Sequence, residues 1–144
     1  TVVHPHAGGY IEFADEIDQL AKDIPYEVAG FCLDTGHLYY SKMDPAEWLQ
    51  KYSTRIDYIH FKDIDRKVYD QIMNETIRFF EACGKGVMCP IGKGIIEYDK
   101  IHGLLKEINY NGYITIEQER DPRNAETSLR DVEESLDYLK SIGY

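Results

Sequence analysis

The 144-residue sequence predicts a single α/β domain, residues 1–144, built on a parallel sheet, and three observations support this prediction. Short apolar runs alternate along the chain with amphipathic segments of helical length. The run VAGFCLD at residues 28–34 is apolar almost throughout, which is typical of a strand buried on both faces. The intervening segments are long enough to cross over between parallel strands. Four such strand–helix units make half of a (β/α)8 barrel, or TIM barrel, and a small open α/β sheet is the structural alternative.

The first half of the sequence predicts three strands and two helices. A β-branched run at residues 1–4 stops at a proline and predicts a short strand. Apolar residues recur at helical spacing within residues 11–23. After the apolar strand, DPAEWLQKYS predicts a helix with Asp44 as its N-cap and Pro45 at its first position. The run RIDYIHFKD at residues 55–63 predicts the third strand.

The second half begins with a segment that predicts one long helix at residues 64–86, closed by Gly84. A glycine-rich loop follows at residues 86–94. We expect this loop to be mobile, because it does not open a helix directly after a strand as a phosphate-binding loop does. The shared apolar face of the long helix consists of Val68, Ile72, Met73, Phe79 and Phe80. The remaining elements are a helix at residues 96–109, a strand at residues 112–119 and a helix at residues 125–143 with Leu129, Val132, Leu136 and Leu139 on one side.

Composition and charge exclude several functional classes. Sixteen basic and twenty-six acidic side chains give a formal net charge of −10, which argues against binding to nucleic acid. No apolar run approaches the roughly 20 residues that cross a membrane, and no secretory signal is visible. Three cysteines, Cys32, Cys83 and Cys89, are odd in number and lack CxxC spacing, so we expect a reduced, cytoplasmic protein.

Every predicted strand ends in polar residues that can bind a metal ion. The carboxyl ends of parallel barrel strands lie on one face, so residues far apart in the sequence converge there. Imidazoles with carboxylates suit a divalent ion, for which we expect Mn²⁺ or Co²⁺, with Zn²⁺, Fe²⁺ or Mg²⁺ as alternatives. One ligand from each strand gives His4, Asp34, His60 and Glu117. The other polar residues at these ends, which would orient ligands or contact substrate, are His6, His37, Lys62 and Glu119.

Each of these residues also has a purely structural interpretation. Asp34 can cap the turn that Thr35 and Gly36 would form. Lys62 and Asp63 can be an exposed charge pair of little energetic consequence. One of the two glutamates on the last strand can pair with a nearby cation. The occurrence of such residues at all four strand ends nevertheless favours a shared metal site.

Five segments in this order resemble one family along essentially the whole chain. They are HPHAGGYIE, LDTGHLYY with DPAEWL behind it, RIDYIHFKD, PIGKGIIEY and GYITIEQERDP. Together they resemble the C-terminal half of the inosose dehydratase branch of the xylose-isomerase-like sugar isomerase/epimerase superfamily of TIM barrels. The resemblance implies a metal site of Asp34, His60 and Glu117, with His4 where many relatives carry Glu and with His6 as the alternative ligand. It also implies that His37 contacts substrate.

The resemblance implies a hydro-lyase that removes water from a cyclic polyhydroxy ketone, 2-keto-myo-inositol, through a metal-stabilised enediolate. The candidates for its acid and base are Glu117, Glu119, His37 and His6, while Lys62 can stabilise negative charge on a substrate oxygen. A ketose or sugar-phosphate epimerase or isomerase on the same barrel is the first rival function, and His4 in place of Glu disfavours it. A DNA-repair endonuclease is the second, which the acidic charge disfavours, and a non-catalytic sugar-binding fragment is the third.

The predicted half-barrel should not be stable alone. Four parallel strands would expose the barrel-facing side of an apolar sheet, a larger patch than soluble monomers usually tolerate. We therefore expect the chain, which opens on TVVHPH without an initiator Met, to be a fragment. It should pair with an N-terminal half-barrel or with another copy.

Overall fold

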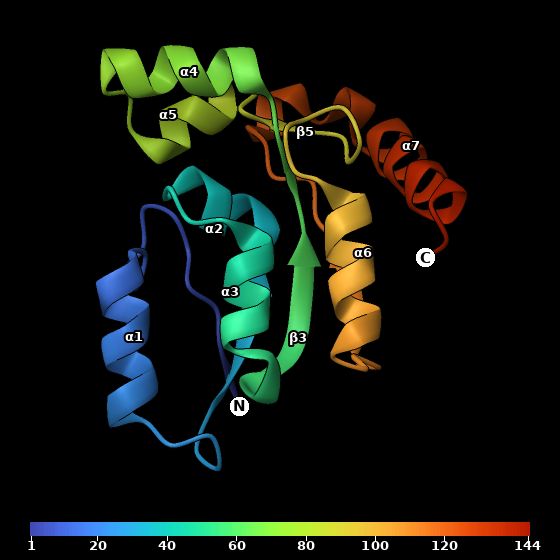
Figure 1. Ribbon diagram of the computed structural model, residues 1–144. Coiled ribbons are helices and arrows are strands. Elements are labelled where there is room, and N and C mark those ends of the chain that lie inside the picture. Colours follow the sequence, from blue (N-terminus) through green and yellow to red (C-terminus); the bar gives the residue numbers. More distant parts are fainter.

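The computed structural model describes residues 1–144, the side chain of Asn124 excepted, and contains a four-stranded parallel sheet (Figure 1). The strand order is β1-β2-β3-β6, and every neighbouring pair is parallel. The register places Asp34 beside His60, so the predicted ligands at the ends of β2 and β3 are neighbours across the sheet. The predicted parallel α/β fold is thereby confirmed. The strands are β1 (Val2–Val3), β2 (Gly30–Asp34), β3 (Ile56–Phe61) and β6 (Tyr113–Ile116).

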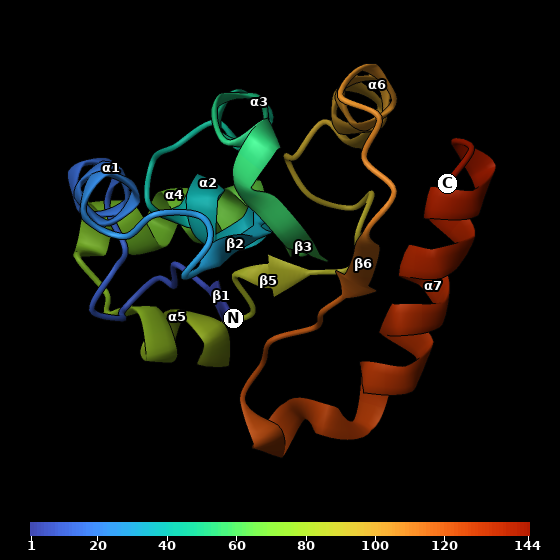
Figure 2. The same cartoon turned by 90° about the horizontal axis from the view of Figure 1, so that it is seen from below.

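Helices follow the strands and cover one face of the sheet, where α1, α3 and α6 lie side by side (Figures 1 and 2). Asp44 caps α3 as predicted, because its carboxylate accepts hydrogen bonds from the backbone N–H groups of Ala46 and Glu47. The core between the layers includes Leu33, Ile59 and Phe61, all fully buried. The helices are α1 (Ala14–Asp23), α2 (Thr35–Tyr40), α3 (Pro45–Lys51), α4 (Arg66–Glu75), α5 (Phe79–Gly84), α6 (Tyr98–Glu107) and α7 (Ser128–Ser141), with 3₁₀ turns at Ser53–Arg55 and Pro122–Thr127.

The predicted long helix at residues 64–86 is two helices, so that prediction was wrong. Asp65 caps the start of α4, and Thr76 ends it in the left-handed conformation with φ of 54°. This backbone conformation stops the helix and turns the chain into α5. As a result Phe79 is buried while Phe80 is 71% exposed, and the two do not share one buried face. Helix α2 was also not predicted. It begins at Thr35, where the sequence indicated only a turn.

Helix α7 is turned differently from the prediction. Leu129 and Leu136 are exposed, and the buried face contains Asp131 and Ser135 together with Leu139. The Ser135 hydroxyl accepts a hydrogen bond from the backbone N–H of Ile91 at 3.0 Å. This polar contact holds the helix against the glycine-rich loop, and hydrophobic periodicity alone cannot reveal it.

The glycine-rich loop is fixed by a buried carboxylate, contrary to the predicted mobility. Asp63 is fully buried, and its oxygens accept hydrogen bonds from four backbone N–H groups at 2.8–3.1 Å. A short antiparallel pair of β4 (Asp63–Ile64) and β5 (Met88–Cys89) adjoins the loop. The interpretation of Lys62 and Asp63 as an exposed charge pair is therefore wrong. The four donors belong to Ile64, Gly92, Gly94 and Ile96.

We expect Asp63→Asn to destabilise the protein by about 3 kcal/mol, because an amide NH₂ would face N–H donors that have no other acceptor. Urea unfolding measures the loss, and hydrogen exchange should show reduced protection of the Gly92 and Gly94 amides. Asp65→Asn is the matched control, because Asp65 caps α4 and asparagine is an equally good N-cap. Equal stability of Asp63→Asn and the wild type would contradict this role.

Arg55 connects the end of α1 to the start of β2. Its guanidinium is buried and donates hydrogen bonds to the carbonyl oxygens of Ala21, Ile24 and Ala29. It also lies 4.8 Å from the centre of the Phe31 ring. The side chain therefore satisfies carbonyl groups in the last turn of α1, at its C-cap and just before β2.

We expect Arg55→Met to lower the free energy of unfolding by about 3 kcal/mol, because three carbonyl oxygens would lose their donor. Denaturant unfolding of the two proteins measures this difference. Arg123→Met is the control, since the Arg123 side chain is 87% exposed and should change stability by less than about 0.5 kcal/mol. A loss of similar size in both variants would rule out a specific role for Arg55.

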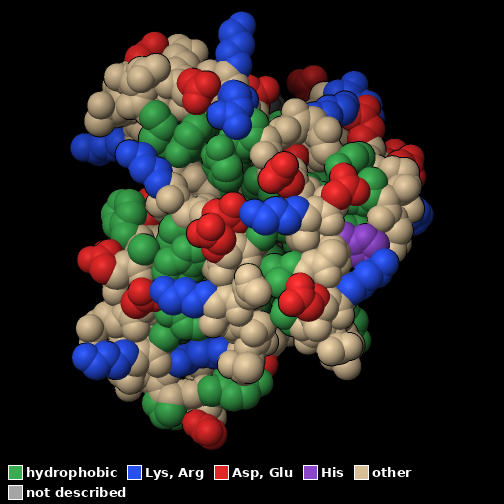
Figure 3. All heavy atoms as spheres, viewed as in Figure 1, with side chains coloured by type: hydrophobic (Ala, Val, Ile, Leu, Met, Phe, Trp, Pro, Cys, Tyr) green, Lys and Arg blue, Asp and Glu red, His purple; other side chains and the backbone are tan. Residues whose placement is uncertain are grey.

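The helical face of the molecule carries charged side chains of both signs with hydrophobic areas between them (Figure 3). Among the described residues, none of the helices combines the length and the apolar character needed to pass through a lipid bilayer.

Candidate metal centre

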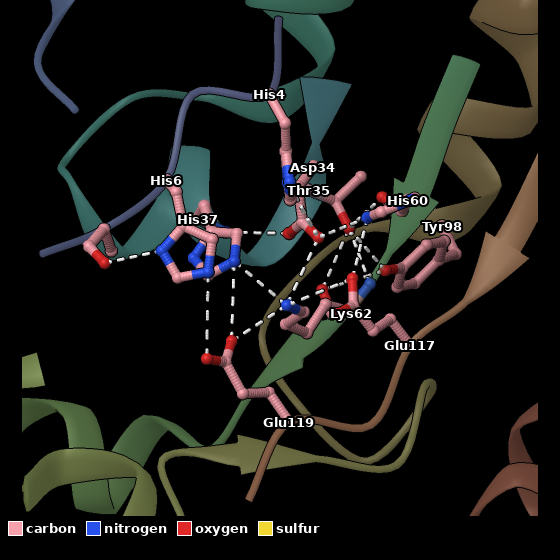
Figure 4. A network of polar contacts seen from close by, with 11 residues as sticks. His4, His6, Asp34, Thr35, His37, His60, Lys62, Tyr98, Glu117 and Glu119 are labelled. Carbon is pink, nitrogen blue, oxygen red and sulfur yellow. Dashed lines mark hydrogen bonds and ion pairs between the residues drawn. The ribbon is translucent and has the colours of Figure 1, made fainter. Parts of the chain in front are cut away.

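Polar side chains from all four strands converge at the carboxyl end of the sheet. Figure 4 shows the predicted residues pointing toward one another from the segment after β1, from β2 and α2, from β3, and from the segment after β6. The parallel arrangement explains this convergence, because each strand delivers its last residues to the same edge. The residues brought together are His4, His6, Asp34, His37, His60, Lys62, Glu117 and Glu119.

Asp34 lies at the centre of the cluster and is 1% exposed. Its Oδ1 accepts a hydrogen bond from the backbone N–H of His37 at 2.9 Å, which caps α2 and fixes the carboxylate. Its Oδ2 lies 3.9 Å from His4 Nε2 and 3.7 Å from His60 Nδ1. Burial raises the pKa of Asp34, although nearby positive charge opposes this change.

His60 and Glu117 form the closest charged pair of the cluster. His60 Nδ1 lies 2.7 Å from Glu117 Oε2, and this neighbour lowers the pKa of Glu117 to about 2. The Cys32 thiol and Glu117 together raise the pKa of His60 to about 10. Positive charge on His60 therefore balances the carboxylates here, and a bound cation could replace that proton.

The four predicted ligands each present a buried atom that lacks a hydrogen-bond partner among the described residues. Buried polar atoms are normally hydrogen-bonded, so four such atoms in one place call for an explanation. The ligand atoms of Asp34, His60 and Glu117 all lie within 4.8 Å of one another. These nitrogen and oxygen atoms suit a divalent transition metal or zinc. The four atoms are His4 Nε2, Asp34 Oδ2, His60 Nδ1 and Glu117 Oε2.

A second group of side chains lies beside the first and includes His6, His37 and Glu119. The ring centroids of His6 and His37 lie 3.7 Å apart with their planes inclined by 37°, and His37 Nε2 lies 3.4 Å from Glu119 Oε2. His6 Nε2 lies 3.8 Å from Glu119 Oε1, while His6 Nδ1 donates to the carbonyl oxygen of Ala7. Lys62 Nζ donates to both His37 Nε2 at 3.0 Å and Glu119 Oε2 at 2.9 Å.

The charges of this second group follow from its contacts. Burial disfavours the Lys62 ammonium, but the carboxylates of Asp34 and Glu119 outweigh this and raise the pKa of Lys62. Burial and the nearby Lys62 charge hold the pKa of His37 far below its usual range, so its imidazole is neutral. Because Lys62 donates to Nε2, the neutral ring carries its proton on Nδ1. Burial, followed by repulsion from His60, lowers the pKa of His4 to about 4.

Two hydroxyl groups that the sequence did not indicate as part of the site hold the backbone beside the centre. The Thr35 hydroxyl lies 2.8 Å from the Tyr98 hydroxyl, and both donate to the carbonyl oxygen of Lys62. The sulfur of Cys32, a residue for which the sequence indicated no role at the site, lies within 4.8 Å of ligand atoms of His4 and His60. Its position two residues before Asp34 on the same strand face was the available signal. No periodicity could indicate Tyr98, because it reaches the centre from the start of α6.

Comparison with known proteins gives relatives that cover most of the chain. The xylose isomerase-like TIM barrel family matches residues 1–142. The chain is 38% identical over 121 residues to the inosose dehydratase of Geobacillus kaustophilus and 36% identical to that of Clostridium botulinum. These matches cover 84% of this chain but only 39% and 41% of the relatives. The chain therefore spans about two-fifths of the length of these curated relatives.

Solved structures show the same fold. A xylose isomerase domain protein from Planctomyces limnophilus matches 98% of this chain and 45% of its own, with a TM-score of 0.71 and 22% identity. The IOLI protein, whose structure holds a zinc atom, matches 98% of this chain and 46% of its own, with a TM-score of 0.66 and 17% identity. The probable 3-DHS dehydratase AsbF of Bacillus anthracis matches 95% of this chain and 48% of its own, with a TM-score of 0.66 and 18% identity. The resemblance found in the sequence is confirmed, and the chain belongs to the xylose isomerase-like TIM barrel family.

Proposed function

We propose that this chain carries the metal site of a dehydratase that removes water from a cyclic polyhydroxy ketone such as 2-keto-myo-inositol. The observation that carries the proposal is a set of four buried ligand atoms, on His4, Asp34, His60 and Glu117, that converge from the four strand ends and form no hydrogen bond among the described residues, only ion pairs with one another and with Lys62. The substrate class is supported by relatives named inosose dehydratase at 33–38% identity. Such a reaction makes the protein a carbon–oxygen lyase.

The metal would be held by the same four residues. A divalent ion such as Mn²⁺ or Co²⁺, when bound, supplies a Lewis acid that polarises the substrate carbonyl. The Asp34 carboxylate is fixed by its hydrogen bond to the His37 backbone, so this ligand is already oriented. We favour His4 over His6 as the fourth ligand, because His4 Nε2 lies 3.9 Å from Asp34 whereas His6 faces Glu119.

Glu119 and His6 are positioned to move protons. Removal of water from a β-hydroxy ketone needs a base for the α-proton and an acid for the departing hydroxyl. Glu119 uses one carboxylate oxygen to accept from Lys62, which leaves Oε1 to take the α-proton. Because His6 Nδ1–H donates to Ala7, His6 Nε2 can accept this proton from Glu119 Oε1, which it faces at 3.8 Å, and then deliver it to the departing hydroxyl, which leaves as water. His6 and Glu119 are also partly exposed, so substrate can reach them.

His37 and Lys62 would complete the substrate side of the site. Lys62 holds His37 and Glu119 in place by hydrogen bonds and adds positive charge where a substrate oxygen becomes negative. His37 would contact substrate from a buried position, and its Nδ1–H has no acceptor in the described part of the chain. His6, His37 and Lys62 thus form the proposed substrate-binding set.

We also propose that further strands complete the sheet. β1 and β6 are its edges, and no other strand of the described residues pairs with them. An N-terminal half-barrel or another copy would cover these edges. Sedimentation of the isolated chain should show association or aggregation, whereas a stable monomer would contradict this proposal.

The unpaired cysteines fit the cytoplasm as the location of the protein.

The function is tested by incubating the protein with 2-keto-myo-inositol and Mn²⁺ or Co²⁺ while following the absorbance of the dione product. We expect product that depends on added metal and disappears with a chelator. Turnover of a ketohexose without any dione would instead indicate an epimerase. Turnover of 2-keto-myo-inositol that is insensitive to chelation would contradict the role of the metal.

A further inference from the structure

The ammonium group of Lys62 lies between the two groups of potential ligands. On one side, Nζ is 3.4 Å from Asp34 Oδ2 and 3.4 Å from Glu117 Oε2. On the other side, it is 3.0 Å from His37 Nε2 and 2.9 Å from Glu119 Oε2. The close-up in Figure 4 shows Lys62 at the junction of these contacts. A single positive charge therefore contacts both the proposed metal ligands and the neighbouring group.

The neighbouring group could itself hold a metal ion. Ligand atoms of His6, His37 and Glu119 lie within 4.8 Å of one another, as close as those of the first group. His37 is 2% exposed, and imidazole with carboxylate is a normal donor set for a divalent ion. The ammonium, however, already binds Nε2 of His37 and Oε2 of Glu119. A second ion on these atoms would have to displace it.

Lys62 cannot easily move aside, because its backbone and stem are both fixed. The Thr35 hydroxyl accepts from the Lys62 backbone N–H and donates to the Lys62 carbonyl oxygen, both at 2.9 Å. The stem crosses the first turn of α2 directly over Gly36. A Cβ atom at Gly36 would lie 2.8 Å from Lys62 Cβ and 2.9 Å from Cγ, closer than side chains allow. Glycine at this position is therefore what lets the stem reach the centre.

We propose that Lys62 is a built-in cation that occupies the place of a second metal ion and limits the centre to one divalent ion, with Gly36 as its positioning residue. This inference rests on the metal site proposed above. Lys62 also offsets part of the negative charge of the three carboxylates Asp34, Glu117 and Glu119. Removal of its charge should leave both ligand groups open to metal.

The test is Mn²⁺ binding followed by calorimetry and electron paramagnetic resonance, which do not depend on turnover. We expect the wild-type protein to bind one Mn²⁺ with an uncoupled six-line spectrum. Lys62→Ala should bind two ions with a spin-coupled spectrum, because ions held this close interact magnetically. Two coupled ions in the wild type, or one ion with unchanged affinity in a folded Lys62→Ala variant, would overturn the inference. Absence of any bound Mn²⁺ in the wild type would instead overturn the proposed metal site itself.

Gly36→Ala provides a second test that keeps the charge but displaces the stem. We expect it to acquire the two-ion spectrum at saturating Mn²⁺. Gly103→Ala is the matched control, because Gly103 lies in α6 with no atom within 4 Å of an added Cβ, and it should keep the one-ion spectrum. One-ion spectra in both glycine variants would overturn the role of Gly36. If Lys62→Ala does not fold, the inference is tested by the number of Mn²⁺ ions that the wild type and Gly36→Ala bind.

Discussion

Asp34→Ala is expected to abolish metal binding, and with it dehydration of the ketone. Asp34 supplies the carboxylate that lies between His4 and His60, and its buried Oδ2 forms no hydrogen bond among the described residues. Loss of an outer-shell partner typically costs about 10- to 100-fold in metal affinity, so loss of this ligand should cost more. Metal analysis after dialysis and calorimetric titration with Mn²⁺ measure the effect. Unchanged metal content would contradict the site.

The control for this experiment must separate metal binding from helix capping, because Asp34 also caps α2. Asp44 has the same capping role at α3 and lies outside the cluster. Asp44→Ala should lose about 1 kcal/mol of stability through its cap while its metal affinity stays unchanged. If both variants lost metal equally, unfolding rather than ligand loss would explain the result.

The sequence was sufficient to predict which residues meet at the centre. Parallel strands deliver their last residues to one edge, so LDTGH and HFKD indicated convergence once the strands had been recognised. Helix α3 was also predictable, because its start depends on a local signal at Asp44. These predictions succeed because each depends on strand order or on a few adjacent residues.

The contacts between the two motifs were not predictable from either motif alone. Thr35 and Gly36 were interpreted as turn residues, yet Thr35 binds the Lys62 backbone and Gly36 makes room for the Lys62 stem. Asp63 was interpreted as exposed, although it fixes a loop about thirty residues later in the chain. The break at Thr76 depends on a left-handed backbone conformation that a threonine side chain does not signal. Such features depend on tertiary packing, which periodicity does not describe.

The two glutamates that follow β6, Glu117 and Glu119, should show different defects, although they are only two residues apart. Glu117 Oε2 faces His60 in the metal group, whereas Glu119 faces Lys62, His37 and His6. We expect Glu119→Gln to keep its bound metal and to lose about 10²- to 10⁴-fold in kcat, because the amide cannot accept the α-proton. Steady-state kinetics of the metal-saturated variant measure this loss, with KM expected to change little.

Glu117→Gln is the matched comparison, since it makes the same chemical change two residues earlier in the same segment after β6. We expect it to weaken Mn²⁺ binding, because the amide has lost the negative charge that a metal ligand needs here. Part of its activity should return at high Mn²⁺, whereas added metal should not rescue Glu119→Gln. Wild-type kcat in Glu119→Gln would remove Glu119 as the base and leave Glu117 or a histidine in that role. Metal loss in Glu119→Gln would instead place Glu119 among the metal ligands, together with or in place of Glu117.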